Sequence, residues 1–344
     1  MFEIKSFGSI CSGVGFQEMA IKKVYPGIDI KFHSDIDSAA NKAYGVVHNN
    51  NFYKNYYDSL GIKQLGDFTQ VLFPEYVDFL FASTPCQDFS TIGSQKGFEG
   101  KKGNLTWEFI EYLKRSSELP KVIGFENVTG LLQEQFKEGY KWFKDELKSL
   151  GYKVNQYILN AKNYGIPQNR DRVFLICTKG NYVVKTPKHK KLKFTFKDVA
   201  KDNGVLIPEH ILKSIENKQG DFAARFETNS SKISKCIVTK PTYNSYTNNF
   251  FTDDFKKYTI QDIKRLNIPV YALNSKAYWL LMGASEEDYY KLKENGLSDN
   301  QISKISGNGI VVDVLEYLFQ ELKNSYIEEQ PFEIVGNTIA YTLF

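Results

Sequence analysis

The stretch VDFLFASTPCQDFS, residues 77–90, decides the fold. Its first six residues form a largely apolar run between Pro74 and Pro85, which predicts a buried strand of a parallel sheet. Cys86 follows this strand and would lie at the carboxyl edge of the sheet, where open α/β folds bind their ligands. A free cysteine is also common as a small buried hydrophobic residue. The neighbouring segments must therefore decide between a structural and a chemical role.

Composition sets the class of protein. The chain has 344 residues, enough for one large or two ordinary domains, and its 42% hydrophobic and 24% charged residues are typical of a soluble globular protein. A net charge of +4 permits a nucleic-acid partner without requiring one. The four cysteines lack paired short spacings, so we expect neither a disulfide framework nor a zinc site; they are Cys11, Cys86, Cys177 and Cys236.

The first residues lack the apolar core of a signal peptide, and no apolar run approaches membrane-spanning length. We therefore expect a cytoplasmic protein without a membrane partner.

Two strand-and-loop units precede the strand before Cys86. Residues 4–10 predict a strand, and residues 11–16 a glycine turn that leads into an amphipathic helix, as in the first unit of a doubly wound nucleotide-binding sheet. A second strand, residues 28–34, ends at Asp35, where such folds hydrogen-bond a ribose. Asp67 precedes a short helical stretch and would either cap that helix or accept a hydrogen bond from an adenine amino group.

A further buried strand, residues 121–125, would bring Glu126 to the same sheet edge as Cys86. Between them, residues 87–104 are polar and contain four glycines, which predicts a mobile loop that closes over the site. The helix after this loop is expected to bury Trp107 in the core.

Arg170 and Arg172 lead into a strand over residues 173–177. We expect one of them on each face of the sheet, and both should have partners, because an unpaired buried guanidinium is costly.

The composition changes from about residue 179. Residues 188–193 are basic, and residues 229–249 are rich in Ser, Thr, Asn, Lys and Tyr. A basic run is usually a solvated face, although interleaved aromatic and small polar side chains suit contacts with phosphates and base edges. A helix is predicted over residues 310–319, followed by a tail.

Taken in order, these segments resemble the bacterial DNA cytosine-5 methyltransferases, over most of the chain outside residues 179–267. The order of the short motifs carries the resemblance: Ser12-Gly13-Val14-Gly15, Asp35-Ile36-Asp37, Gly66-Asp67-Phe68-Thr69, Pro85-Cys86-Gln87, Glu126-Asn127-Val128, Gln168-Asn169-Arg170-Asp171-Arg172 and Gly307-Asn308.

The resemblance implies a fold and a division into domains. The fold would be a doubly wound, mostly parallel α/β sheet of the S-adenosylmethionine-dependent methyltransferase type. Residues 1–185 would form the first part of the catalytic domain, and residues 186–283 a smaller inserted target recognition domain. Residues 284–306 would be a hinge, and residues 307–344 the helix that completes the catalytic domain, plus a tail.

The resemblance also implies a role for each matching residue. Cys86 would be the nucleophile, Glu126 the acid that binds the cytosine edge, and Arg170 and Arg172 the pair that supports them. The methyl donor S-adenosylmethionine would be bound by Ser12, Gly13, Val14, Gly15, Asp35, Ile36, Asp67, Phe68 and Asn308. Substrate would be contacted by Pro85, Gln87, Asn127 and Gln168. No metal is implied.

The implied activity is methyl transfer to carbon 5 of a flipped-out cytosine in a short sequence of double-stranded DNA, through a covalent bond between Cys86 and the base. We expect a monomer of bacterial or phage origin. A cognate restriction endonuclease, acting independently, would be its partner in a restriction-modification system.

Three departures from the family pattern concern packing. Phe16-Gln17 replaces a third small residue after the glycines, Ala272 stands where the family usually has an arginine, and Gly309 where it has a serine.

Other functions are open on the same scaffold. A tRNA cytosine-5 methyltransferase shares this core, but that branch carries a Cys-Phe-Thr tripeptide that is absent here. Amino-group methyltransferases would show an Asp/Asn-Pro-Pro-Tyr/Phe motif in place of residues 83–86. A catalytically silent DNA-binding protein is disfavoured because Cys86, Glu126 and both arginines are present.

Overall fold

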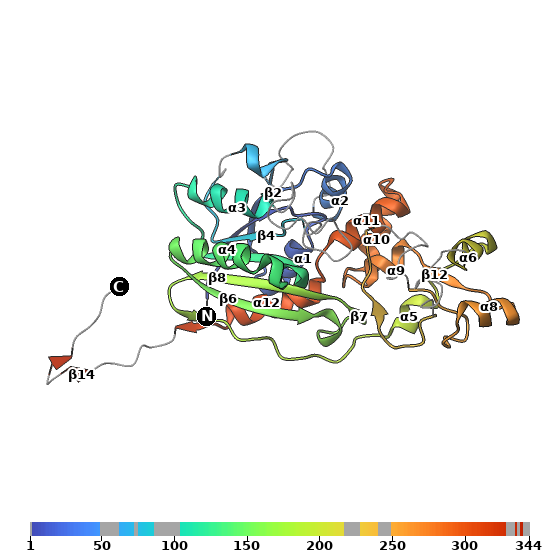
Figure 1. Ribbon diagram of the computed structural model, residues 1–344. Coiled ribbons are helices and arrows are strands. Elements are labelled where there is room, and N and C mark those ends of the chain that lie inside the picture. Colours follow the sequence, from blue (N-terminus) through green and yellow to red (C-terminus); the bar gives the residue numbers. More distant parts are fainter. Residues whose placement is uncertain are drawn as a thin grey trace.

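The computed structural model describes residues 2–48, 62–71, 75–85, 104–216, 228–239 and 249–327, with two short strands at 334–335 and 338–339 (Figure 1). Cys86, Gln87 and nearly all of the predicted mobile loop lie outside these residues.

A seven-stranded sheet forms the centre of the molecule, in the order β3-β2-β1-β4-β5-β8-β6. The strands are β1 Ser6–Ile10, β2 Asp29–Ser34, β3 Lys63–Gln64, β4 Phe79–Ala82, β5 Val122–Val128, β6 Tyr152–Asn160 and β8 Asp171–Lys179. The strands from β3 to β5 pair in parallel, and β8 is antiparallel to both β5 and β6. The prediction of a doubly wound, mostly parallel sheet is confirmed.

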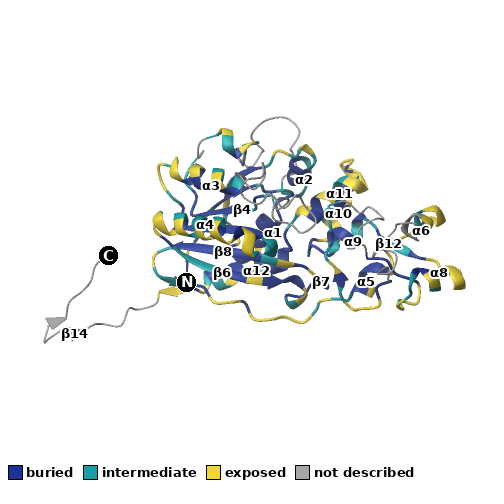
Figure 2. Cartoon of the chain, viewed as in Figure 1, coloured by how far each residue is buried: buried dark blue, intermediate teal, exposed yellow. Residues whose placement is uncertain are grey.

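Helices cover both faces of the sheet (Figures 1 and 2). One face carries α1 Phe16–Val24, α2 Ser38–His48 and α12 Val312–Lys323, and the other carries α3 Asn104–Lys114 and α4 Lys137–Ser149. Alternate side chains of β4 reach opposite faces: Phe79 and Phe81 pack edge-on against Phe319 of α12, and Leu80 joins the core beneath α3 and α4. Burial on both faces explains why this strand is a continuous apolar run.

The helix that we predicted over residues 310–319 begins at Val312 and continues to Lys323. It packs against α1, so the end of the chain completes one layer of the sheet domain. Beyond it, β13 Tyr326–Ile327 pairs with β9 Tyr182–Val183, and β14 Ile334–Val335 pairs with β15 Thr338–Ile339.

A second group of elements has its own small apolar cluster, which includes Phe250, Ile260 and Val270. Its helices are α5 Phe196–Ala200, α6 Glu209–Glu216 and α8 Ile260–Leu266, and its strands are β10 Gly204–Leu206 and β12 Tyr271–Leu273. A further pair, β11 Ser234–Lys235 with β7 Gln168–Asn169, connects this region to the segment before β8.

Three helices follow: α9 Ser275–Leu280, α10 Glu286–Glu294 and α11 Asp299–Asn308. The segment predicted to be a hinge, residues 284–306, holds α10 and most of α11, and its side chains Leu292 and Ile302 are fully buried. Single 3-10 turns occur at Phe68–Gln70, Thr129–Leu132, Glu134–Phe136 and Ala161–Asn163.

The expectation that Trp107 is a core residue is wrong. Its side chain is 36% exposed and stacks on Trp142 of α4, with ring centroids 3.4 Å apart. The buried face of α3 is formed by Phe109, Ile110 and Leu113. At about 100° of rotation per residue, position 107 lies roughly a third of a turn away from the centre of that face.

One carboxyl group of α1 is completely buried. Glu18 accepts a hydrogen bond from the Ser9 hydroxyl of β1. Burial raises the pKa of Glu18 to about 7, against the opposing effect of the Ser9 hydrogen bond. The folded protein therefore favours the neutral form of this side chain.

We predict that Glu18→Gln reduces the pH dependence of stability. The pKa of Glu18 rises on folding from 4.5 to about 7, so its contribution is fully present below the lower value and is lost as the pH rises to the upper one. This difference corresponds to about 3 kcal/mol. Urea unfolding at about pH 5 and about pH 8 should show a larger loss in the wild type than in the variant. Equal losses in the two proteins would exclude Glu18 as the titrating group.

Candidate active site

The carboxyl ends of four parallel strands meet at one edge of the sheet. Ile10 of β1 lies opposite Ser34 of β2 and Ala82 of β4, and Ala82 lies opposite Phe125 of β5. The predicted site residues therefore share one edge. Ser12 to Gly15, Asp35 with Ile36, and Pro85 follow these strands, and Glu126 with Asn127 lie in the last residues of β5.

The glycine loop after β1 is tied to the end of β2. Gly13 and Gly15 have φ angles of 57° and 82°, in the left-handed region that favours glycine. Asp35 accepts hydrogen bonds from the backbone amides of Gly13 and Asp37, both at 2.8 Å. These contacts hold the Asp35 carboxylate beside the loop, and burial raises its pKa.

A third loop joins the same place. The Ser12 amide donates to the Ser34 carbonyl at 2.9 Å, and the Ser34 hydroxyl donates to the Gly66 carbonyl at 2.6 Å. Asp67 is exposed and caps the following turn by accepting from the Thr69 amide at 3.0 Å. The Phe68 ring is buried and packs edge-on against Tyr112 in the core.

This part of the edge fits an adenosyl cofactor. A Cβ atom built on Gly13 or on Gly66 would have no heavy atom within 4 Å, so both turns border open space. Asp35 lies between them along the edge, and the apolar side chain of Ile36 is 79% exposed. The site thus offers a carboxylate for hydroxyl groups and an apolar surface for an aromatic ring. Val14 is buried in the loop itself.

The end of α11 lies next to these loops. Lys304 donates to the Asp37 carboxylate at 2.5 Å, and a Cβ on Gly309 would collide with the Phe16 ring. Asn308, the last residue of α11, is exposed. The close approach of Gly309 to Phe16 also gives a packing reason for two of the departures from the family pattern, because the larger Phe16 requires the smaller Gly309.

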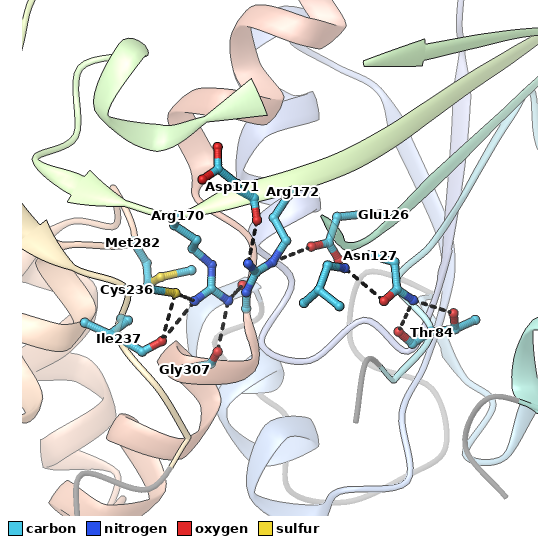
Figure 3. Close-up of polar contacts among 12 residues, drawn as sticks. Thr84, Glu126, Asn127, Arg170, Asp171, Arg172, Cys236, Ile237, Met282 and Gly307 are labelled. Atoms are coloured by element: carbon cyan, nitrogen blue, oxygen red, sulfur yellow. Dashed lines mark hydrogen bonds and ion pairs between the residues drawn. The ribbon is translucent and has the colours of Figure 1, made fainter. Parts of the chain in front are cut away.

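Glu126 and Arg172 form a largely buried ion pair at the end of β5 (Figure 3). Glu126 is 7% exposed, and its Oε1 lies 3.1 Å from Arg172 Nε. Burial raises the pKa of Glu126, and the positive charges of Arg172 and Arg170 oppose that rise without cancelling it. Arg172 also donates to the Asp171 carbonyl at 2.7 Å, which fixes the guanidinium plane.

Asn127 connects β5 to the segment that leads to Cys86. Its amide nitrogen donates to the carbonyl of Thr84 at 3.2 Å and lies 3.3 Å from the Thr84 hydroxyl, and its carbonyl accepts from the Val128 amide. The side chain is 1% exposed. The sequence predicts a substrate contact for Asn127, which stays a prediction, and these bonds position Thr84.

Gln168 and Arg170 bind main-chain atoms from distant parts of the chain. Gln168 donates to the Leu281 carbonyl at 2.7 Å and accepts from the Ile237 amide at 3.2 Å. Arg170 donates to the carbonyls of Ile237, Gly307 and Gly309 at 3.1, 2.9 and 2.7 Å. Both side chains are buried, so the catalytic sheet, residues 236–237 and the end of α11 are joined at this point.

The expectation that Arg170 and Arg172 point to opposite faces is wrong. Both guanidinium groups interact with the thiol of Cys236, and Figure 3 shows them side by side. Side chains two residues apart in an extended segment point in the same direction.

Cys236 lies beside Arg170 and Arg172, and the sequence analysis did not identify it as a site residue. Burial opposes its ionisation, but Arg170 and Arg172 outweigh that effect, so the pKa of the thiol is lowered. No local motif marks this residue, because its arginine neighbours are more than sixty positions away in the chain.

The described part of the chain contains no cluster of three or more His, Cys, Asp or Glu side chains able to hold a metal ion. Among the same residues, no helix is long and apolar enough to span a membrane.

The sheet and its helices have the Rossmann-like fold of S-adenosylmethionine-dependent methyltransferases. The model of the family described as C-5 cytosine-specific DNA methylase matches residues 5–324. The chain belongs to this family.

Individual relatives agree with this assignment. The type II methyltransferase M2.ScrFI of Lactococcus lactis subsp. cremoris is 29% identical over 292 residues, which are 80% of this chain and 73% of the relative. The orphan methyltransferase M.SPRI of Bacillus phage SPR is 32% identical over 49% of this chain and 36% of its own length. The chain thus spans about a third of the length of this phage relative, and 32% of a second one from Bacillus phage rho11s.

Among solved structures, the Entamoeba histolytica methyltransferase EhMeth has the same fold, with a TM-score of 0.72 and 18% sequence identity. The similarity covers 94% of this chain and 99% of that one.

We predict that Arg170→Met destabilises the protein by about 3 kcal/mol or more, because a buried guanidinium that bonds three carbonyl groups is lost. Arg115→Met, at an exposed position at the end of α3, should change the stability by less than about 0.5 kcal/mol. Urea unfolding measures both, and limited proteolysis should cut the region around residues 228–239 faster in Arg170→Met. If the two variants unfold alike, the junction at Arg170 does not hold these segments together.

Proposed function

We propose that the protein transfers a methyl group from S-adenosylmethionine to carbon 5 of a cytosine in a specific short sequence of double-stranded DNA. The observation that carries this proposal is the largely buried Glu126–Arg172 pair at the sheet edge, beside the segment that leads to Cys86. Membership of the cytosine-5 family supports the reaction, and the open turns at Gly13 and Gly66 support the cofactor.

The cofactor would be held by the glycine loop, by Asp35 and Ile36 at the end of β2, and by Asp67 and Phe68 after β3. Asn308 would contribute from the end of α11. When bound, S-adenosylmethionine supplies an electrophilic methyl group on a sulfonium centre.

Cytosine C5 is too weak a nucleophile to accept this group unaided. Attack of the Cys86 thiolate on C6 forms a sulfur–carbon bond and pushes the electrons of the C5–C6 double bond into the ring, so that C5 becomes enamine-like. After C5 has gained the methyl group, a base removes the C5 proton, the C6–sulfur bond breaks and the thiolate is regenerated. One difficult step is thereby replaced by several easier ones.

Glu126 would act as an acid during the attack. The charge that enters the ring collects at N3, and a protonated carboxyl group there neutralises it. Such an acid needs a raised pKa, and the burial of Glu126 raises it. Arg172 holds Oε1, and the proton would be on the second oxygen, toward the base.

Arg170 would contribute to this site indirectly. Its bonds to Gly307, Gly309 and Ile237 fix the surroundings of Arg172. The positive charges of Arg170 and Arg172 would together favour the thiolate form of Cys86. Gln168 would have the same positioning role through Leu281 and Ile237.

The target atoms lie inside a stacked duplex, so the nucleotide must be rotated out before reaction. Pro85 and Gln87 would contact the extruded base, and residues 87–104 would close over it. Residues 186–283 would form the target recognition domain, which reads base edges in the major groove and binds phosphates with a salt-dependent affinity. Residues 284–306 would link this domain to the closing helix. We propose that the protein acts as a monomer, with or without a cognate endonuclease.

We predict that Cys86→Ala abolishes methylation, because the thiol proposed to form the covalent bond to C6 is removed. The wild type and the variant are expressed in a methylation-deficient bacterial host, and 5-methylcytosine is mapped at base resolution. Methylation at one short motif in the wild type alone would support the proposal and reveal the recognition sequence. Residual turnover in the variant would exclude Cys86 as the nucleophile.

Unmodified DNA from the wild type would lead to an assay on tRNA, the substrate of the alternative activity. If tRNA also stays unmodified, a silent DNA-binding protein on this scaffold would replace the proposed enzyme.

We predict that Glu126→Gln slows single-turnover methylation by a factor of about 100 or more, because an amide cannot transfer a proton to N3. In the wild type the rate should fall as the pH rises through the raised pKa of Glu126, since the protonated form is then lost. This alkaline decrease should be absent from the variant. A decrease of the same size in both proteins would assign it to a different group.

A further inference from the structure

A group of polar side chains, buried except for the half-buried His48, lies beside the glycine loop. Its members are Glu18 of α1, His33 of β2, and Tyr44 and His48 of α2. The proposed reaction uses none of them.

His48 bonds directly to the loop. Its Nε2 lies 3.1 Å from the carbonyl oxygens of both Val14 and Gly15. Carbonyl oxygens can only accept, so Nε2 must carry the ring proton. The other nitrogen, Nδ1, lies 3.5 Å from the Lys22 ammonium, which is a donor only. The contacts therefore fix one neutral tautomer of His48.

The Val14 carbonyl depends on this contact more than the Gly15 carbonyl does. Gly15 also accepts a hydrogen bond from the Met19 amide at 3.0 Å, as part of the first turn of α1. Val14 lies between the two glycines of the loop and is 1% exposed. A donor from α2 thus satisfies the backbone where the loop turns into the helix.

The ring of His48 has little freedom to move. The Tyr44 ring packs on the His48 ring, with ring centroids 4.5 Å apart. The His33 ring in turn stacks on Tyr44, with ring centroids 3.7 Å apart. His33 Nδ1 in turn lies 3.3 Å from the Ser12 hydroxyl. A Cβ atom on Gly15 would come within 2.4 Å of His48 Nε2, so loop and histidine are already in close contact.

We propose that His48 is a positioning residue for cofactor binding. Its side chain holds the loop from Ser12 to Gly15 in the shape that receives the methionine end of S-adenosylmethionine. This inference rests on the proposed function. His48 lies behind the loop and contacts it through Val14 and Gly15, so its loss should weaken cofactor binding while leaving the rate of transfer in the saturated enzyme nearly unchanged.

The test compares His48→Leu, which removes the donor, with His48→Gln, whose amide nitrogen can replace Nε2. The matched control is Tyr152→Phe, which also removes one buried side-chain bond to a carbonyl, that of Pro120 at 2.7 Å, at the opposite end of the strands. Calorimetry measures the affinity of each protein for S-adenosylhomocysteine without DNA, and thermal unfolding measures stability.

We expect His48→Leu to bind about tenfold more weakly, His48→Gln to recover most of that loss, and Tyr152→Phe to bind as the wild type does even if its stability falls. Wild-type affinity in His48→Leu would overturn the inference, as would an equal loss in Tyr152→Phe or no recovery in His48→Gln. A wild-type protein that binds no S-adenosylhomocysteine would instead refute the proposed function.

If His48→Leu does not fold, nitrogen-15 spectroscopy of the wild-type histidines gives a second test. A proton on Nε2 of His48, with a signal that shifts when S-adenosylhomocysteine is added, would support the inference. A proton on Nδ1, or no shift, would overturn it.

Discussion

The parallel pairing of β1 with β2 on one side and β4 on the other is the constraint on which the site depends. Parallel strands end at the same edge of the sheet, so the loops that follow them meet at that edge. The glycine loop, Asp35, the segment before Cys86 and Glu126 come together for this reason alone. Burial of the sheet on both faces by α1, α12, α3 and α4 keeps the strands apolar and leaves the edge as the place for polar groups.

The buried Arg170 and the partly buried Arg172 stabilise that edge in different ways. Arg172 is paired with the Glu126 carboxylate, whereas Arg170 donates to three carbonyl groups. A guanidinium bonded to neutral acceptors keeps its full charge, and it lowers the pKa of the neighbouring Cys236 thiol. It also makes residues 236–237, the end of α11 and the start of β8 depend on one another. The same side chain, Arg170, therefore sets part of the charge at the site and holds the distant segments together.

The two histidines next to the glycine loop are kept uncharged at neutral pH, whereas Glu18 is neutral below about pH 7 and ionises above it. Burial lowers the pKa of His33 and of His48 to about 3, and raises that of Glu18 to about 7. Neutral histidines avoid repulsion with a cationic sulfonium cofactor, and the nearby Asp35 carboxylate is left as the charge that the loop presents.

The sequence by itself determined the sheet, its helices and the motif order, because buried strands and helix faces leave periodic apolar patterns that depend on near neighbours. Those patterns predicted Asp35 and Glu126 at strand ends. The positions of Arg170, His48 and Cys236 were decided only by the tertiary structure. Their partners are distant in the chain, or are backbone carbonyl groups, which every residue has and which therefore leave no pattern in the sequence. The prediction that Trp107 is a core residue was wrong for a related reason. A large apolar side chain can lie in the core or stack on a neighbour at the surface, and only the packing of α3 against α4 shows that Trp107 does the latter.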